Sequence, residues 1–459
     1  MSKEFNNTTD GKVNSGEHLK KTSYKENKKE RKYQIKEEKR QERKAKSVRK
    51  KINKRTSINS NSNSYIDSPN SSARVKRPNQ KRKISLKRLI VIFIAVLILF
   101  VLIFVVLNAD LISCENASNF VQYGILNNRK DESFPVNLEG ASISNGNFSR
   151  MGNDLCYASD TKFSIVNTYG REVYSNLISF INPILASSDE YSLVYSLGDK
   201  DFFIASKKGL VYQSESKDKI LVASINNNGE YALVTESDGY LSKLYVYNKD
   251  NEQIYAYSFA DFYITSVDLS ENGRRIALSG VSALHGKEIS AIYVLDISKE
   301  DPVCFEKIEG EILYKIGLLG NNYGCAIGKT ASYSFKINSK EFNKIDYEGK
   351  TMSSFAISRN SSLFYVALSR SGDGRNCDIV SVDNNGKIIG TNETELQITS
   401  LSAYKNRVLA LSSSDVYLFA PNGNQISKVY LDIEPRCAIL FTSKNAYILG
   451  VSDISSIGL

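Results

Sequence analysis

The sequence predicts an all-β protein: a β-propeller over residues 136–459, preceded by one transmembrane helix over 89–107 and a disordered basic tail over 1–88. Three observations predict this organisation. A unit of short strands recurs about every forty residues after position 136. Only seven Pro occur in the chain, and no 3.6-residue apolar stripe supports helices in this part. A run of nineteen apolar residues precedes the repeats and is followed by a linker over 108–135.

The repeat is clearest at residues 220–247. An apolar strand at 220–225 leads into the polar turn Asn226-Asn227-Asn228-Gly229, and two more strands follow at 231–234 and 243–247. These segments are rich in β-branched and aromatic residues and are separated by turn residues, as strands are. A period near forty with four strands is typical of a propeller blade. The predicted units begin near residues 147, 181, 221, 264, 312, 354, 398 and 438.

The last unit, over residues 437–459, has room for only three strands. We expect its outer strand to come from residues 134–142 (FPVNLEGAS), because such closure removes two exposed sheet edges. The prediction is therefore eight blades. Seven blades with an accessory hairpin, or a pair of β-sandwiches, are the alternatives.

Residues 89–107 (LIVIFIAVLILFVLIFVVL) contain no charged or polar side chain. As a helix the run would be about 28 Å long, close to the roughly 30 Å of a bilayer core. A buried helix of a soluble protein is the weaker interpretation, since core helices rarely lack a polar side. The run is therefore predicted to span a membrane.

The charges beside this run predict its orientation. Lys and Arg outnumber Asp and Glu about threefold in residues 1–88, whereas the rest of the chain has an acidic excess. Basic residues crowd positions 74–88, and none occurs from Asn108 until Arg129. Because cytoplasmic flanks carry the basic excess, we expect the N-terminus inside and the propeller outside the cytoplasmic membrane.

Two other interpretations of the apolar run remain open. A cleaved signal peptide would have a short basic segment before it, and here 88 residues precede the run. Leu111-Ile112-Ser113-Cys114 resembles a bacterial lipobox, but Asn108 and Asp110 separate it from the apolar run. Cys114 is thus a candidate for lipidation, with a plain linker thiol as the favoured interpretation.

The tail over 1–88 has few large apolar side chains, so it cannot offset the entropy of ordering and is predicted to be disordered. Its last basic residues are expected to contact anionic lipid headgroups, since each basic side chain near such a surface gains about 1 kcal/mol. Nucleic acid is a less favoured partner, and a role in topology alone is a further alternative. The predicted lipid-contacting residues are Lys81, Arg82, Lys83, Lys87 and Arg88.

In its repeats the chain resembles WD-repeat-like and quinoprotein-like β-propellers. Its layout looks most like that of an uncharacterised family of single-span, propeller-bearing membrane proteins from anaerobic Gram-positive bacteria. The resemblance implies the fold over residues 136–459 and the anchored layout. Because the chain contains no Trp, neither the Trp-Asp signature nor the aromatic docking motif of quinoproteins is present, and the resemblance implies no cofactor.

Catalytic and metal-binding patterns are sparse. His285 is the one histidine of the predicted propeller and is expected in a solvated loop, within an insert over 280–287. Ser371-Gly372-Asp373-Gly374 with Asp378 lacks the alternating oxygens of a calcium loop, so a plain loop is favoured. The cysteines are expected to be free thiols. We predict no cofactor and no metal. Candidate carboxylates for a channel-lining pair are Asp189, Glu190, Asp199, Asp201, Asp238, Asp268 and Glu271.

These observations favour a non-catalytic binding or scaffold module that recognises a protein or a cell-envelope glycan through one face of the propeller. The alternative is an exported hydrolase of glycan or peptide. A channel holding two carboxylates about 5–9 Å apart, with surrounding aromatics, would favour the hydrolase. A flat apolar or mixed-charge face without that pair would favour binding.

Overall fold

The computed structural model describes residues 96–99, 134–139, 143–144 and 146–459. The chain divides into two compact units, Met1–Asp110 and Leu111–Leu459. In the first unit the described residues 96–99 are helical, and no helix of the described residues is long and apolar enough to cross a membrane. The rest of the predicted span, Cys114 and the basic residues 81–88 lie outside the described residues, and what was expected of them stays a prediction.

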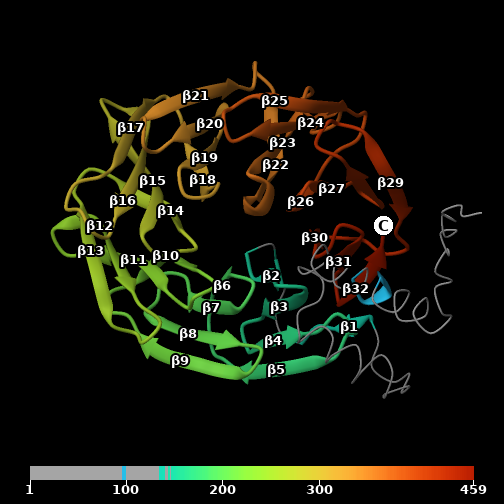
Figure 1. Ribbon diagram of the computed structural model, residues 1–459, viewed down its shortest axis with the longest axis horizontal. Coiled ribbons are helices and arrows are strands. Elements are labelled where there is room, and N and C mark those ends of the chain that lie inside the picture. The colour runs from blue at the N-terminus through green and yellow to red at the C-terminus, as the bar shows by residue number, and fades with distance from the viewer. Residues whose placement is uncertain (1–95, 100–133, 140–142, 145) are drawn as a thin grey trace, which may run out of the picture. The chain divides into compact units, whose positions relative to one another are not determined.

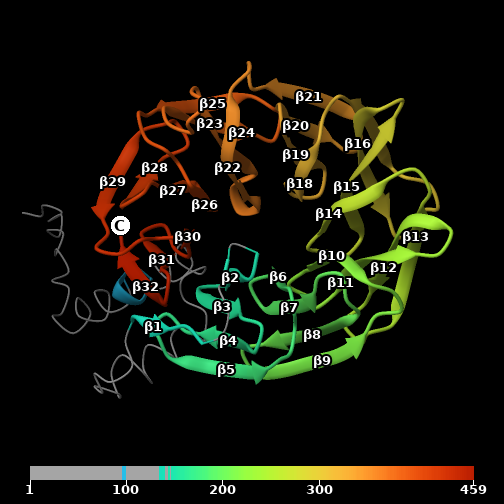
Figure 2. The same ribbon diagram turned by 180° about the vertical axis from the view of Figure 1, so that it is seen from behind.

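The second unit is a propeller of eight four-stranded antiparallel sheets, as the sequence predicted. The sheets follow one another around a central axis, with the first strand of each blade innermost and the fourth at the rim (Figure 1, and from behind in Figure 2). We call the region enclosed by the first strands the channel. The predicted starts of the units agree with the observed first strands to within about three residues.

Blades 1 to 4 follow in chain order. Blade 1 comprises β2 (Phe148–Met151), β3 (Asp154–Ala158), β4 (Lys162–Val166) and β5 (Glu172–Leu177). Blade 2 comprises β6 (Pro183–Ser187), β7 (Tyr191–Ser196), β8 (Asp201–Ser206) and β9 (Gly209–Glu215). Blade 3 comprises β10 (Ile220–Ile225), β11 (Tyr231–Ser237), β12 (Tyr240–Tyr247) and β13 (Gln253–Phe259). Blade 4 comprises β14 (Tyr263–Leu269), β15 (Arg275–Leu284), β16 (Lys287–Asp296) and β17 (Cys304–Glu309).

Blades 5 to 8 complete the ring. Blade 5 comprises β18 (Leu313–Leu318), β19 (Tyr323–Gly328), β20 (Ala331–Lys336) and β21 (Glu341–Asp346). Blade 6 comprises β22 (Thr351–Ser358), β23 (Leu363–Ser369), β24 (Cys377–Asp383) and β25 (Ile388–Glu393), with a 3₁₀ turn, η2 (Arg359–Ser361), after β22. Blade 7 comprises β26 (Ser400–Tyr404), β27 (Arg407–Leu411), β28 (Asp415–Phe419) and β29 (Gln425–Tyr430). Blade 8 comprises β30 (Cys437–Leu440), β31 (Asn445–Leu449), β32 (Asp453–Gly458) and β1 (Val136–Asn137).

The position of a strand in its blade explains its residues. Second strands are mostly buried, and β23 is buried at every position, because neighbouring blades cover both sides of the sheet. Fourth strands such as β29 alternate exposed and half-buried residues, because one side faces solvent. Eight apolar clusters fill the spaces between neighbouring blades, with contacts such as Phe163 on Phe203, whose ring centroids are 5.4 Å apart.

The ring closes with a strand from the N-terminal side, as predicted for residues 134–142. β1 pairs with β32, placing Val136 opposite Ile454 and Asn137 opposite Asp453. The ring of Phe134 lies 5.6 Å from that of Tyr447, and Tyr447 stacks on Phe441 at 4.0 Å. Closure therefore gives the last three strands the fourth neighbour that their own segment lacks.

Because each blade is an antiparallel meander, its turns alternate between two faces. We call the face where the first strands end, and where the turns after the first and third strands lie, the mouth face. The opposite face carries the turns after the second strands and the links between blades, and we call it the far face. The hairpin of β15 and β16 extends on the far face, because the predicted insert over 280–287 continues the strand pairing up to the turn His285-Gly286.

Candidate functional site

A polar cavity of about 220 Å³ lies on the mouth face, at the channel. The ends of β2, β6, β22 and β26 and the turns after β10 and β14 supply its lining, so six of the eight blades contribute residues. A second cavity of about 250 Å³ adjoins it and shares Asp189, Asn227, Glu271, Arg359 and Asn360. We call this continuous depression the channel mouth.

The strands around the channel are joined by side chains that accept a backbone N–H of the next blade. Ser224 accepts from Leu269 at 3.1 Å, which joins blade 3 to blade 4. Ser354 accepts from Leu401 and Ser402 from Leu440, both at 2.9 Å. A neutral hydroxyl is therefore sufficient for these joints.

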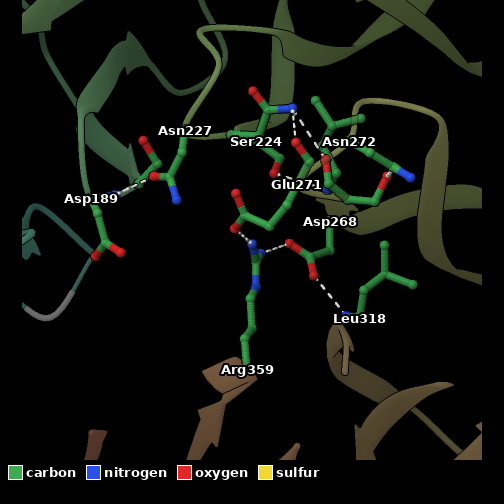
Figure 3. Close-up of polar contacts among 12 residues, drawn as sticks. Asp189, Ser224, Asn227, Asp268, Glu271, Asn272, Leu318 and Arg359 are labelled. Atoms are coloured by element: carbon green, nitrogen blue, oxygen red, sulfur yellow. Dashed lines mark hydrogen bonds and ion pairs between the residues drawn. The ribbon is translucent and has the colours of Figure 1, made fainter. Parts of the chain in front are cut away.

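Blade 4 places Asp268 where blade 3 has Ser224. Asp268 is 4% exposed and accepts the N–H of Leu318 in blade 5 at 2.7 Å through Oδ2. Its Oδ1 accepts a hydrogen bond from Nη2 of Arg359, which comes from η2 of blade 6 (Figure 3). One oxygen thus makes the joint between blades, and the other holds a charge that the joint itself does not require.

Arg359 reaches from blade 6 to blade 4, past blade 5. Figure 3 shows the carboxylates of Asp268 and Glu271 both directed at its guanidinium. Glu271 Oε1 lies 3.5 Å from Arg359 Nη1, and the side chain of Glu271 remains 55% exposed. Asp268 is thus the buried partner of the arginine, and Glu271 is the exposed one.

A second charged group lies at the lining contributed by blades 1, 2 and 7. Arg150 of β2 makes an ion pair with Asp189 at 3.3 Å, and its guanidinium lies 5.1 Å from the centre of the Tyr404 ring. Lys405 Nζ lies 5.7 Å from the same ring. Such contacts are favourable because the ring face is electron-rich, so Tyr404 gathers two cations at the channel mouth.

The turn after β10 in blade 3 makes hydrogen bonds to the backbone of both Asp189 and Glu271. Asn227 Oδ1 accepts the backbone N–H of Asp189 at 2.7 Å, and Asn228 Nδ2 donates to the carbonyl of Glu271 at 2.8 Å. Asn226 Nδ2 donates to the carbonyl of Ser270 at 3.1 Å. The three asparagines therefore fix neighbouring turns of blades 2 and 4 as well as forming their own turn.

Lys315 of β18 lies within the channel, near Asp268 and Arg359. Its side chain is exposed to the channel, while the surrounding protein removes it from bulk water. This desolvation lowers the pKa of the Lys315 amine; the Asp268 carboxylate opposes the shift, and Arg359 adds to it. The charged form of Lys315 is thus less favourable in the folded chain than in water.

The structure separates the candidate carboxylates. Asp189, Asp268 and Glu271 meet at the channel mouth, and Glu190 is exposed beside it. Asp199, Asp201 and Asp238 lie at the turns after the second strands, on the far face. The three carboxylates at the mouth each lie in an ion pair with an arginine.

Sequence reasoning did not identify Arg150, Arg359, Tyr404 or Lys405 as site residues. Each lies at the end of a first strand or just after it, where a polar residue is expected in any turn and gives no sign of a site. A signal was present in the repeat itself, because Asp268 stands where the aligned residue of the clearest repeat is Ser224. A charge at a position that a neutral residue can fill indicates a role beyond the fold.

The other residues considered for chemistry lie elsewhere. His285 is exposed in the turn between β15 and β16. Asp378 pairs with Lys350 and Arg370, both at 3.1 Å, and Asp373 accepts from Ser371 and from the N–H of Arg375, so cations of the protein and local donors occupy this loop. Within the described residues, no group of three or more His, Cys, Asp or Glu could hold a metal ion.

The five cysteines within the described residues are free and buried: Cys156, Cys304, Cys325, Cys377 and Cys437. Burial raises the pKa of the Cys156 and Cys304 thiols to about 11 and that of Cys437 to about 12. These thiols are packing groups in the blades and not nucleophiles.

The far face differs from the channel mouth in its exposed apolar side chains. Leu177 and Ile181 are each 83% exposed there, Tyr430 is 67% exposed and Val451 58% exposed. Further exposed apolar residues on this face are Leu197, Tyr240, Tyr263 and Leu284. The two faces therefore offer different surfaces to a partner.

Residues 130–459 match the family of unknown function DUF5711. The chain belongs to this family. The match covers the whole propeller, so the fold described here is the fold of this DUF5711 member. No curated protein sequence matches the chain.

Solved structures with a similar fold are distant in sequence. BamB from Moraxella catarrhalis is 11% identical, with a TM-score of 0.46 over 72% of this chain and 99% of that one. Apo AztD from Citrobacter koseri is 11% identical, with a TM-score of 0.44 over 68% of this chain and 89% of that one. Hydrazine synthase from Kuenenia stuttgartiensis is 10% identical, with a TM-score of 0.44 over 70% of this chain and 97% of that one. The function of the DUF5711 member must therefore be argued from its own residues.

Proposed function

We propose that this DUF5711 member is a non-catalytic binding module that recognises a protein or a cell-envelope glycan at the channel mouth. The observation that carries the proposal is the convergence of charged and polar side chains from six blades on one cavity. Turns on a rigid propeller suit recognition, because the scaffold fixes side chains that are distant in the sequence.

The carboxylates at the mouth favour binding over hydrolysis. A glycosidase needs one carboxylic acid that gives up its proton and one carboxylate that acts as base or nucleophile. Here Asp268 and Glu271 share one guanidinium, and Asp189 pairs with Arg150. Paired in this way, the carboxylates neutralise cations and position them, which is a recognition role.

The sequence supports a membrane-anchored form of this module. The apolar run over 89–107 would be its single span, with the N-terminus in the cytoplasm and the propeller outside. Lys81, Arg82, Lys83, Lys87 and Arg88 would then lie at the inner headgroups, where anionic lipids attract them. Protease added to protoplasts tests this part: it should degrade the propeller, and a protected propeller would reverse the orientation.

The channel mouth is tested by crosslinking in intact cells. A photoreactive amino acid at Asn360, in the cavity lining, should capture a partner that the same group at Tyr240, on the far face, does not. Mass spectrometry of the crosslinked product identifies the partner. Capture from Tyr240 and not from Asn360 would overturn the assignment and move recognition to the far face.

A further inference from the structure

Arg150 and Arg359 present two guanidinium groups at the channel mouth. Arg150, Arg359 and Lys405 line the cavity, together with Asp189 and Glu271. Behind this lining lie Asp268 and Lys315, one acid and one base. An incoming carboxylate would therefore meet a guanidinium in a site where low local dielectric strengthens the attraction.

Glu271 is the replaceable partner of Arg359. The buried Asp268 accepts a hydrogen bond from Arg359 and is tied to Leu318, so it stays in place. Glu271 is more than half exposed and approaches Arg359 only to 3.5 Å. A guanidinium presents five N–H donors in a planar fork, so a second carboxylate can take the position that Glu271 holds.

The shape of the lining favours a peptide over a sugar. Tyr404 is the one aromatic residue in the lining of either cavity, and the cations of Arg150 and Lys405 already lie over its ring. No aromatic platform is thus left for a sugar ring in this part of the structure.

We propose that the channel mouth binds an acidic peptide segment of a partner protein, one carboxylate of which displaces Glu271 from Arg359. The inference rests on the proposed binding function and names its ligand class. Arg150 attracts a neighbouring negative charge of the segment. Asp268 keeps the Arg359 guanidinium aimed into the channel before and after the peptide binds.

Fluorescence anisotropy with the purified full-length chain tests this inference. The probe is a fluorescein-labelled peptide of alternating Gly and Glu, and its comparison peptide carries Gln in place of each Glu. The Glu peptide should bind at least tenfold more tightly than the Gln peptide at low salt, and added salt should remove the difference. Because the basic tail over 1–88 also attracts acidic peptides, the inference is overturned by equal binding of the two peptides and also by a preference that Arg359→Gln leaves unchanged.

Two variants should change the affinity for the Glu peptide in opposite directions. Arg359→Gln should weaken binding by roughly ten- to hundredfold, because a hydrogen bond between charged groups contributes about that factor to an affinity. Glu271→Gln should tighten it several-fold, because the competitor for Arg359 is gone. The controls are Arg407→Gln and Glu190→Gln, whose native residues lie on the same face and line neither cavity. Weaker binding by Glu271→Gln would contradict the displacement step.

An oligogalacturonate serves as the acidic sugar probe. It should compete with the Glu peptide at least tenfold less well than an unlabelled copy of that peptide, and equal competition would overturn the choice of a peptide. The proposed function is judged separately by capture from Asn360 in cells. If a partner is captured from Asn360 but the protein does not prefer the Glu peptide, this inference is overturned and the proposed function stands.

Discussion

Blades 3 and 4 make the same joint to the next blade with different side chains. Ser224 accepts the N–H of Leu269, and Asp268, at the aligned position one blade later, accepts the N–H of Leu318. The serine makes only this joint, whereas the aspartate also accepts a hydrogen bond from Arg359 of blade 6, two blades further along the ring. The difference shows that the charged bridge is an addition to a joint that hydroxyls make at other blades, as Ser224, Ser354 and Ser402 do.

The largest expected effect follows from removing the acceptor of the charged joint. Asp268→Ala leaves the N–H of Leu318 without its acceptor and Arg359 with only its exposed partner, Glu271. We expect a loss of about 2–3 kcal/mol in the free energy of unfolding, since a buried unsatisfied group costs about 1–3 kcal/mol and the half-exposed arginine adds less. Urea unfolding of the full-length chain measures it, with Asp250→Ala in an exposed turn as control. A change no larger than that of the control would show that this joint does not stabilise the fold.

A smaller effect is expected at the neutral joint. Ser224→Ala removes one uncharged acceptor and leaves the N–H of Leu269 unpaired, so about 1 kcal/mol should be lost. The exposed Ser339→Ala is the matched control. If Ser224→Ala costs as much as Asp268→Ala, leaving Arg359 without its buried partner has no cost of its own, and the expected order of the two effects is wrong.

The comparison becomes sharper when the blade 3 residue is placed in blade 4. Asp268→Ser restores a hydroxyl that can accept from Leu318, as Ser224 does from Leu269. We expect the free energy of unfolding of this variant to lie within about 1 kcal/mol of the wild-type value. An unfolding midpoint as low as that of Asp268→Ala would show that the carboxylate itself is needed at this joint.

The smallest expected effect concerns Lys315, which follows the bulge of β18 as Val222 follows that of β10. Its pKa is lowered in the folded chain, chiefly by desolvation, so the unfolded chain binds its proton more tightly. The charged amine therefore lowers the free energy of unfolding at any pH below its folded pKa. This penalty disappears as the pH rises toward the unfolded pKa of about 10.4. Lys315→Val should raise the unfolding temperature slightly at pH 7, and the gain should shrink at higher pH. A gain that is constant between pH 7 and 10 would show that titration of the amine is not its cause.

Much of the fold was predictable because it repeats. Apolar strands and polar turns at a period near forty located the blades, and the short last unit indicated that residues 134–142 supply the closing strand. These are local patterns, and their physical cause acts within one blade. The predicted span, tail and lipid contacts stay predictions, since residues 81–88 and most of 89–107 lie outside the described residues.

The candidate site was predictable only in its acids. Asp189, Asp268 and Glu271 were among the carboxylates considered, but nothing in the sequence placed Arg359 beside Asp268, 91 residues away. Their contact depends on the width of the ring and on the turn after β22, which sequence periodicity does not specify. Asn226, Asn227 and Asn228 were correctly assigned to a turn, yet their bonds to blades 2 and 4 follow from packing between blades.

The central claim is that the charged bridge between Asp268 and Arg359 serves binding and not folding. The double variant Asp268→Ser with Arg359→Gln tests it most directly, because replacing both partners of an ion pair by neutral groups leaves no charge unpaired. We predict that its free energy of unfolding in urea lies within about 1 kcal/mol of the wild-type value, while its preference for the Glu peptide over the Gln peptide falls at least tenfold. A loss as large as the about 2–3 kcal/mol expected of Asp268→Ala, or an unchanged preference for the Glu peptide, would contradict the claim.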